Sequence, residues 1–531
     1  MTTEAQSHAQ HGTVPEAIGV LGAGQMGAGI AQLAAHAGAT TYLYDPDPAA
    51  LQKGIERVAD GLGRMEACGR IDAAAKAATL ARLQPVGSIA ELAPCGCVIE
   101  AAPERLELKH ALLGEVAAVV GPACVLATNT SSLSITEIAA GVEGPERVVG
   151  LHFFNPAPVM RLVEVVAGLA TGPDALATAR AVGDAMGKTV IDAADIAGFL
   201  VNRVNRPFFL EALRILQDGI ATTEQIDRIV RLGGGFRMGP FELMDLIGIE
   251  TNHAVAESFL RQTYGEPRYR PSPLAARMVA GGRLGRKTGI GWYPYGEDAP
   301  ARAADPAAPG PGGGDGRALV VLGDTRVAVE LREAAADAGW AVSSSAGPAG
   351  EVAWLTVDAS ASPSDGGGDG GRAAGPRAVL LSTASLHLTA PAAAGFHVVA
   401  PLTAAALVEV TRTPLTDPDA ADRLAVLLTT LGKLVEPVGD GPGLVLGRIL
   451  VQVINEAAVL IGEGNGSPAD VDTGMELGLN YPVGPVALAE RIGLGRVLAL
   501  LDGLADDRRE ERYRAAPLVR YRAAIGAGLA G

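Results

Sequence analysis

The stretch AIGVLGAGQMGAGIAQLAAH at residues 17–36 decides the fold. Its first five residues form a short apolar run typical of a buried strand, and Ile30–Ala37 has the apolar periodicity of a helix. Between them lies the sequence GAGQMG, whose glycines permit a tight turn, close approach of backbone N–H groups to a pyrophosphate, and close packing of helix on strand. A strand, a glycine-rich turn and a helix in this order predict the start of a dinucleotide-binding fold.

A second predicted strand, Thr41–Tyr44, ends at Asp45, about 20 residues after the turn. An acidic side chain at that place can accept hydrogen bonds from an adenosine ribose, and it repels the additional phosphate of NADP. The alternative is a structural turn followed by a capping aspartate, but strand, turn, helix and acid occur together. The sequence therefore predicts NAD as the cofactor, bound by Gly22, Gly24, Gln25, Met26, Gly27 and Asp45.

Strands and helices alternate through the following residues. A helical pattern from Pro48 to about Leu83 precedes three further apolar runs that predict strands, at Cys97–Glu100, Val125–Ala127 and Val148–His152. This alternation predicts an α/β fold, a Rossmann-type doubly wound sheet that is parallel and has helices on its faces. From about Gly198 to Leu284 the pattern has only the helical period, so a separate all-α domain is expected.

The C-terminal part of the chain repeats the N-terminal part. Advancing by 245 residues takes His152 to His397 and Glu164 to Glu409, and the register continues without a gap as far as Gly248 and Gly493. The run ALVVLGDTRVAVELREAAADAGW from Ala318 resembles the opening stretch more loosely. The chain is thus predicted to be a tandem duplication. The expected parts are an NAD-binding domain at 1–193, a helical domain at 194–295, a linker at 296–316, a degenerate Rossmann-like domain at 317–438 and a second helical domain at 439–531.

The second copy lacks most residues that the first copy could use for chemistry. Thr325 stands for Gly24, Ala328 for Gly27, Ala384 most plausibly for Ser131 and Gly447 for Asn202, although His397 and Glu409 remain. A side chain in the glycine turn would occupy the space of a pyrophosphate. We therefore expect the second copy to be inert and to pack on the first as an intramolecular pseudo-dimer, with homo-oligomers also possible.

Composition excludes several classes of protein. The 531 residues carry a formal charge of −16, which disfavours a nucleic-acid binder, and 48% are hydrophobic, as in a globular protein. Apolar runs such as Leu112–Ala127 are interrupted by charge, and the first residues lack a secretory signal, so no membrane association and a cytoplasmic location are expected. The four cysteines form no C-x-x-C pair, so neither a metal site nor disulfides are predicted, and buried thiols are expected.

One cluster of polar residues could perform oxidation of an alcohol. Removal of hydride from an alcohol carbon requires a base for the hydroxyl proton, and His152 suits that role. Glu164 on the neighbouring strand could fix the histidine tautomer, and Ser131 and Asn202 could hold substrate oxygens. Each residue taken alone could be structural, as a strand-end histidine, a solvent-facing glutamate, a turn or a helix cap. Their joint occurrence after the dinucleotide motif favours the catalytic interpretation.

Seven motifs make a family recognisable, in family order over residues 17–295. They are GAGQMGAGIAQ, AAPE, ATNTSSLSIT, GLHFFNPAPVMRLVEVV, DIAGFLVNR, MGPFELMDLIG and GRKTGIGWY. Together they resemble the NAD-dependent L-3-hydroxyacyl-CoA dehydrogenases, including the 3-hydroxybutyryl-CoA dehydrogenases of fatty-acid β-oxidation. The resemblance implies that His152 is the catalytic base paired with Glu164, that Ser131 and Asn202 contact substrate, and that three further residues surround the nicotinamide half of the cofactor. These three are Glu104, Lys109 and Asn129.

The duplicated layout resembles the long bacterial members of this family associated with phenylacetate catabolism, which implies 3-hydroxyadipyl-CoA as substrate. An acyl-CoA needs local positive charge, and Lys53, Arg57 and Arg64 fall on one face of a predicted helix, which could equally be a solvated face. Two other functions stay open. A dehydrogenase of another 3-hydroxyacid would typically use a lysine base, and a non-catalytic NAD-binding scaffold would not need the intact polar cluster.

Overall fold

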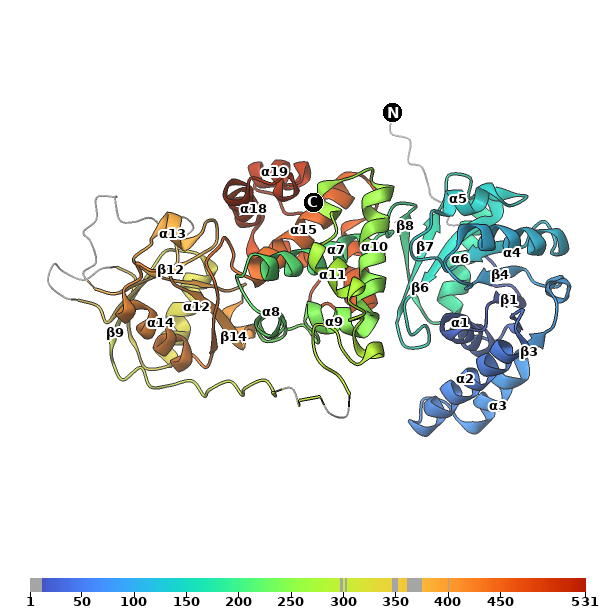
Figure 1. The fold of residues 1–531 in the computed structure, drawn as a ribbon, viewed down its shortest axis with the longest axis horizontal. Helices are drawn as coiled ribbons and strands as arrows, with labels where there is room; N and C mark the ends of the chain where they lie inside the picture. The colour runs from blue at the N-terminus through green and yellow to red at the C-terminus, as the bar shows by residue number, and fades with distance from the viewer. Residues whose placement is uncertain (1–11, 297–298, 301–302, 346–351, 361–374, 400) are drawn as a thin grey trace, which may run out of the picture. The chain divides into compact units, whose positions relative to one another are not determined.

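The computed structural model describes residues 12–296, 299–300, 303–345, 352–360, 375–399 and 401–531 (Figure 1). The chain divides into two compact units. Unit 1 comprises Met1–Arg203 and Asn465–Leu479, and unit 2 comprises Val204–Gly464 and Asn480–Gly531. Each unit is built around its own sheet.

Unit 1 contains an eight-stranded sheet in the order β3-β2-β1-β4-β5-β6-β7-β8. Its strands are β1 (Ala17–Leu21), β2 (Thr40–Tyr44), β3 (Leu83–Val86), β4 (Cys97–Glu100), β5 (Val125–Thr128), β6 (Val148–Phe153), β7 (Leu162–Ala167) and β8 (Thr189–Ala194). Neighbouring strands pair in parallel except β6 and β7, which are antiparallel. The predicted doubly wound sheet is confirmed, with one antiparallel pair that the sequence did not indicate.

The helices of unit 1 cover this sheet. They are α1 (Gln25–His36), α2 (Pro48–Ala67), α3 (Ala73–Arg82), α4 (Leu106–Val119), α5 (Ile135–Ala140), α6 (Pro173–Ala185) and, from the second copy, α16 (Pro468–Leu479). The apolar face of α1 contributes Ile30 to a core that also contains Val20 and Leu151 from the strands. This packing places the glycine-rich turn at the carboxyl end of β1.

The helical stretch predicted from Pro48 to about Leu83 consists of two helices, α2 and α3, with a break that the sequence pattern did not indicate. The chain leaves α2 through Gly69, whose φ is 73°, and α3 starts afresh at a cap in which the Ala75 N–H donates to Asp72 Oδ1 (2.7 Å). The expectation of buried thiols also needs one correction. Three cysteines are buried, but Cys68 is exposed because it follows the end of α2 at this turn.

Unit 2 contains a seven-stranded sheet in the order β10-β9-β11-β12-β13-β14-β15. Its strands are β9 (Ala318–Leu322), β10 (Ala341–Ser343), β11 (Leu355–Asp358), β12 (Arg377–Leu380), β13 (Ala394–His397), β14 (Leu407–Thr411) and β15 (Leu434–Pro437). The helices α12 (Arg326–Asp337), α13 (Leu386–Thr389) and α14 (Pro418–Thr430) accompany it. The strand order repeats that of unit 1 without a counterpart of β3, and β13 and β14 again form an antiparallel pair. The sequence repeat is therefore a repeat of the fold.

The remaining helices form an all-α part, as predicted. From the first copy these are α7 (Val201–Gln217), α8 (Thr223–Arg228), the π-helical turn η3 (Ile229–Gly233), α9 (Pro240–Ile247), α10 (Ile249–Gln262) and α11 (Pro273–Ala280). From the second copy they are α15 (Leu446–Gly462), α17 (Pro485–Ile492), α18 (Leu494–Arg508) and α19 (Pro517–Ala524). None of the described helices is long and apolar enough to cross a membrane. Residues 362–376, SPSDGGGDGGRAAGP, have a composition typical of a surface loop and lie almost wholly outside the described residues.

Candidate active site

The glycine-rich turn between β1 and α1 has the shape that a dinucleotide requires. A Cβ on Gly27 would lie 1.8 Å from the Gly22 carbonyl oxygen, so only glycine allows α1 to approach the strand this closely. A Cβ on Gly24, in contrast, would meet nothing within 4 Å. The open space lies where the helix N-terminus can receive a phosphate. The turn therefore fits a bound pyrophosphate on geometric grounds.

Asp45 lies beside this turn, at the end of β2. Its Oδ2 accepts a hydrogen bond from the Ala23 N–H (2.8 Å), which ties the carboxylate to the turn. Gln25 donates through Nε2 to Asn155 Oδ1 (3.0 Å), and Met26 packs against the core. The structure thus brings together the six residues that the sequence proposed for the cofactor.

His152 and Glu164 lie opposite one another on the antiparallel strands β6 and β7. The Nδ1 atom of His152 is 2.6 Å from Glu164 Oε2, and the two residues are 5% and 0% exposed. An ionised carboxylate accepts, so Nδ1 carries the proton and the Nε2 lone pair is left as the basic position. Phe154 and Phe199 pack against the imidazole, with ring centroids at 4.7 and 5.7 Å. The contacts of Phe154 and Phe199 with the imidazole could not be foreseen from the sequence.

Glu164 is also fixed from its other side. Its Oε1 accepts hydrogen bonds from the backbone N–H groups of Leu200 (3.1 Å) and Val201 (2.9 Å), where α7 begins. These two hydrogen bonds tie the carboxylate to the start of α7. Asn202 follows Val201 in the first turn of α7, so the same helix start that holds Glu164 also carries the proposed substrate-contacting amide.

Glu104 organises the loop that contains Ser131. Its Oε1 accepts from Thr130 Oγ1 (2.6 Å) and from the backbone N–H groups of Ser131 (3.1 Å) and Ser132 (3.0 Å). Burial alone would raise the pKa of Glu104, but Lys109 and the hydrogen bonds that Glu104 accepts outweigh it, so this pKa is lowered. Ser131 itself is exposed, which leaves its hydroxyl accessible to a substrate.

Lys109 and Asn129 have structural contacts in this site. The Lys109 ammonium lies 2.8 Å from both Glu100 oxygens and 3.2 Å from Glu104 Oε2, and it is 1% exposed. Asn129 Oδ1 accepts from the Phe153 N–H (2.8 Å), which joins the end of β5 to β6. Glu100 was missed by the sequence analysis, although an acid ending an apolar strand beside the cofactor turn was a usable signal.

The three basic residues proposed for the CoA phosphates are all exposed on α2. Arg57 Nη1 donates to the Ala23 carbonyl oxygen (3.1 Å), so this guanidinium is attached to the cofactor turn. Lys53 and Arg64 are not brought into the cluster around His152 by any described contact. Among the described residues, no group of three or more His, Cys, Asp or Glu side chains is placed to hold a metal ion.

The counterpart of this site in unit 2 has different hydrogen bonds. His397 and Glu409 again face each other across an antiparallel pair, but His397 Nδ1 donates to the Leu381 carbonyl (2.6 Å). Glu409 accepts only from the backbone of Val445 (2.7 Å) and Leu446 (3.0 Å) within the described structure. Burial lowers the pKa of His397 to about 4 and raises that of Glu409 to about 8. The residue pair is retained, while the hydrogen bond between its members is lost.

A nucleotide-binding sheet, a glycine turn and a paired histidine and carboxylate define the class of NAD-dependent dehydrogenases. The NAD-binding domain of 3-hydroxyacyl-CoA dehydrogenase matches residues 17–196, and the C-terminal domain of the same family matches residues 198–295 and again 443–527. The chain belongs to the 3-hydroxyacyl-CoA dehydrogenase family.

Two relatives and one solved structure illustrate the similarity. The 3-hydroxyadipyl-CoA dehydrogenase of Escherichia coli K12 is 38% identical over 514 residues, which cover 97% of this chain and 98% of that protein. A probable 3-hydroxybutyryl-CoA dehydrogenase of Bacillus subtilis is 40% identical over 53% of this chain and 97% of its own length. The crystal structure of 3-hydroxybutyryl-CoA dehydrogenase from E. coli K12 has a TM-score of 0.77 and 36% identity, covering 96% of this chain and 98% of that one.

Proposed function

We propose that this protein catalyses the reversible oxidation of an (S)-3-hydroxyacyl-CoA to the 3-oxoacyl-CoA. The observation that carries the proposal is the buried hydrogen bond of 2.6 Å between His152 Nδ1 and Glu164 Oε2. Bound NAD supplies the hydride acceptor. His152 Nε2 takes the proton of the substrate 3-hydroxyl group, and the positive charge that then forms on the imidazole is stabilised by Glu164.

Two further residues are proposed to orient the substrate. Ser131 stands on the loop that Glu104 holds, and Asn202 stands at the start of α7, which Glu164 holds. Because both supports are hydrogen bonds to carboxylates, of which Glu164 is buried, the hydroxyl and amide groups are carried on fixed backbone. We also assign Glu104, Lys109 and Asn129 to the nicotinamide end of the cofactor, because they match family positions there. Lys53, Arg57 and Arg64 are assigned to the CoA phosphates, because they are exposed basic residues on α2.

The proposed substrate is 3-hydroxyadipyl-CoA, in a phenylacetate-type β-oxidation. Its support is the near full-length similarity to the E. coli protein of that name, whereas the 3-hydroxybutyryl-CoA dehydrogenase of B. subtilis matches about half of this chain. The second candidate is 3-hydroxybutyryl-CoA, because the similar E. coli crystal structure, which covers nearly the whole chain, is that of a 3-hydroxybutyryl-CoA dehydrogenase. We also propose a cytoplasmic location, where the four free cysteines would stay reduced.

The deciding assay follows NADH oxidation with 3-oxoadipyl-CoA and acetoacetyl-CoA side by side, with His152→Gln as the control. A higher kcat/KM for 3-oxoadipyl-CoA supports the substrate proposal, and a higher value for acetoacetyl-CoA supports the second candidate. Absence of His152-dependent turnover with both compounds would refute the function.

We further propose that the two copies form a pseudo-dimer with one active site per chain, divided at the domain boundaries that the sequence suggests. Its first support is an exchange of equivalent helices. In unit 1, α16 of the second copy packs on β7 and β8. In unit 2, η3 of the first copy packs on β14, where the Ala406 N–H donates to the Leu232 carbonyl (2.9 Å). The shift of 245 residues relates η3 to part of α16 and β7 to β14.

The second support is a pair of reciprocal contacts between the helical parts of the two copies in unit 2. Tyr269 of the first copy donates to Glu456 of the second (2.5 Å), and Tyr513 of the second donates to Glu211 of the first (2.8 Å). Arg448 adds a buried ion pair to Glu211. Each tyrosine of one copy thus contacts the glutamate of the other copy. Such reciprocal contacts are the pattern of a two-fold interface. A fragment ending at Tyr295 that is soluble, monomeric and fully active would contradict the pseudo-dimer.

A further inference from the structure

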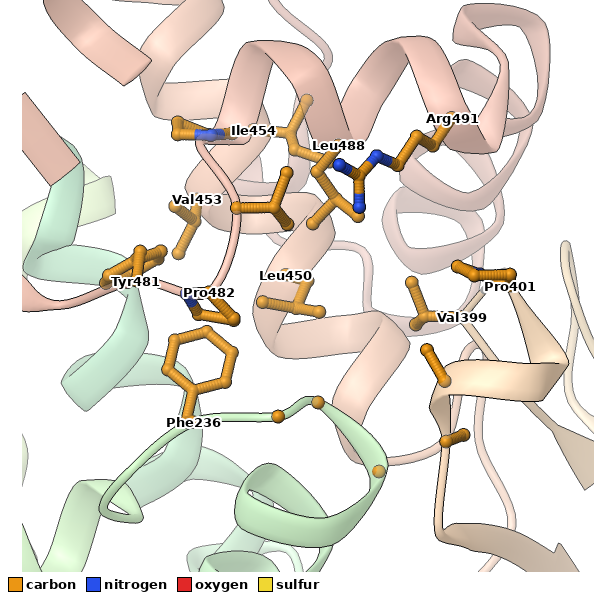
Figure 2. A pocket seen from close by; sticks show the side chains of 17 residues that line it. Phe236, Val399, Pro401, Leu450, Val453, Ile454, Tyr481, Pro482, Leu488 and Arg491 are labelled. Carbon is orange, nitrogen blue, oxygen red and sulfur yellow. The ribbon is translucent and has the colours of Figure 1, made fainter. Parts of the chain in front are cut away.

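Unit 2 encloses a cavity of about 210 Å³ that the proposed reaction does not use (Figure 2). Its wall combines Phe236 and the adjoining glycines of the first copy with Leu450, Val453, Tyr481 and Leu488 of the second. Within the described residues of this wall, Arg491 is the only charged side chain. Figure 2 shows Arg491 at one side of the wall, with its guanidinium turned toward the apolar side chains, and the residue is exposed.

Differences between the two copies account for the cavity. At the shift of 245 residues, Val453 replaces Phe208 and Ile454 replaces Phe209, so two large rings of α7 become smaller aliphatic groups in α15. In the first copy both rings are buried, and Phe208 packs against Phe236 with centroids 5.4 Å apart. The loss of two rings leaves space that the wall of the second copy does not fill.

The cation is also particular to the second copy. Arg491, near the end of α17, stands where the first copy has Leu246. No carboxylate forms an ion pair with Arg491 in the described part of the chain, although arginines elsewhere in unit 2 are paired, such as Arg448 with Glu211. Because Arg491 lines the cavity and is exposed, it lies at the mouth, where its planar guanidinium can donate hydrogen bonds to a ligand that enters.

We propose that this cavity is a binding site for a carboxylate with an apolar body, separate from the catalytic site. A cavity of about 150 Å³ accommodates benzene, so 210 Å³ accommodates a body of about six to eight carbon atoms. The apolar wall receives the body, and Arg491 pairs with the carboxylate at the mouth. The ligand is bound without reaction, because His397 lines a different cavity, of about 30 Å³, and its Nδ1 is held by the Leu381 carbonyl.

Calorimetric titration of the full-length protein with octanoate and with octan-1-ol tests the site. We expect Arg491→Gln to weaken octanoate binding about tenfold or more, since a charged hydrogen-bonded pair is lost, while octan-1-ol binding is unchanged. Val453→Phe returns a ring to the cavity and should abolish binding of both compounds. Arg509→Gln removes an arginine that is 81% exposed and should change neither.

Turnover of the CoA thioester should be the same in all three variants, which separates this site from the proposed active site. If Val453→Phe melts at a lower temperature than the parent, Leu488→Phe replaces it as the filling variant. Equal octanoate affinity in the parent and in Arg491→Gln would overturn the proposal. Unchanged binding in a folded filling variant would also overturn the proposal. The same holds if no binding is detected at roughly 10 mM octanoate, a concentration at which only nonspecific contacts are expected.

Discussion

The substitution Glu164→Gln tests the assignment of His152 as base most directly, because the structure dictates how the new amide must orient. Oε1 of Glu164 accepts from two backbone N–H groups, of Leu200 and Val201. The glutamine carbonyl oxygen must take that place, since the NH2 group would oppose two donors. The NH2 group then faces His152 Nδ1, 2.6 Å away in the parent, and becomes its hydrogen-bond donor.

A donor at that place reverses the histidine tautomer. Nδ1 would have to accept, Nε2 would carry the proton, and the base would be blocked at the atom that meets the substrate. Where an amide replaces the carboxylate beside a catalytic histidine in a serine protease, kcat falls about 10⁴-fold, which corresponds to about 5 kcal/mol in the barrier. We expect kcat for 3-oxoacyl-CoA reduction to fall roughly 10³- to 10⁴-fold, with NADH affinity unchanged.

Stopped-flow and steady-state NADH absorbance measure kcat, and fluorescence quenching measures NADH affinity. The chain supplies its own matched control in Glu409→Gln, at the equivalent position of the second copy. Glu409 also receives the N-terminus of a helix but has no hydrogen bond to His397, so kcat should change less than twofold, roughly the scatter of such comparisons. A loss below about tenfold for Glu164→Gln would refute the tautomer reasoning.

Three further predictions concern the cofactor turn, unit 2 and the CoA phosphates. Gly24→Thr should raise the Kd for NADH about tenfold or more without lowering the melting temperature, because a side chain there meets only open space. His397 has a pKa of about 4 when folded against 6.5 when exposed, so protonation favours the unfolded chain and stability should fall as the pH drops from 6.5 toward 4. His397→Asn should flatten that dependence in urea unfolding followed by tryptophan fluorescence, since all three tryptophans lie in unit 2. Lys53→Ala should raise the KM for CoA thioesters and leave the KM for pantetheine thioesters unchanged. Arg57→Ala should do the same and should also weaken NADH binding, because Arg57 donates to the Ala23 carbonyl oxygen in the cofactor turn. An equal rise in KM for both kinds of thioester would contradict the CoA assignment.

Local signals predicted much of unit 1. The glycine turn and Asp45 could be placed from sequence because their geometry depends on neighbouring residues in one strand–turn–helix unit. His152 and Glu164 could be paired because a short loop brings their strands together. The antiparallel direction of β7 could not be predicted, since LVEVVA is an apolar strand in either direction.

Non-local packing limits what the sequence can tell. The identical pair His397 and Glu409 is not hydrogen-bonded, because the imidazole instead donates to a carbonyl fixed elsewhere in the fold. Whether two retained residues still interact depends on competing hydrogen-bond partners, here the Leu381 carbonyl. The spacing of residues in the sequence does not reveal such partners. The break between α2 and α3 was missed for a different reason, because apolar periodicity continued on both sides of Gly69.

The placement of α16 has a consequence for the order in which the chain can fold. Unit 1 is assembled from residues up to Arg203 and from Asn465–Leu479, so its sheet is synthesised long before the helix that covers β7 and β8. During translation at about 5–20 residues per second, the apolar faces of these strands wait for roughly 13 to 50 seconds for their own cover. A nascent chain of this protein therefore exposes an aggregation-prone apolar surface at the ribosome. The yield of folded protein in cells should depend on chaperones that shield this surface until α16 emerges.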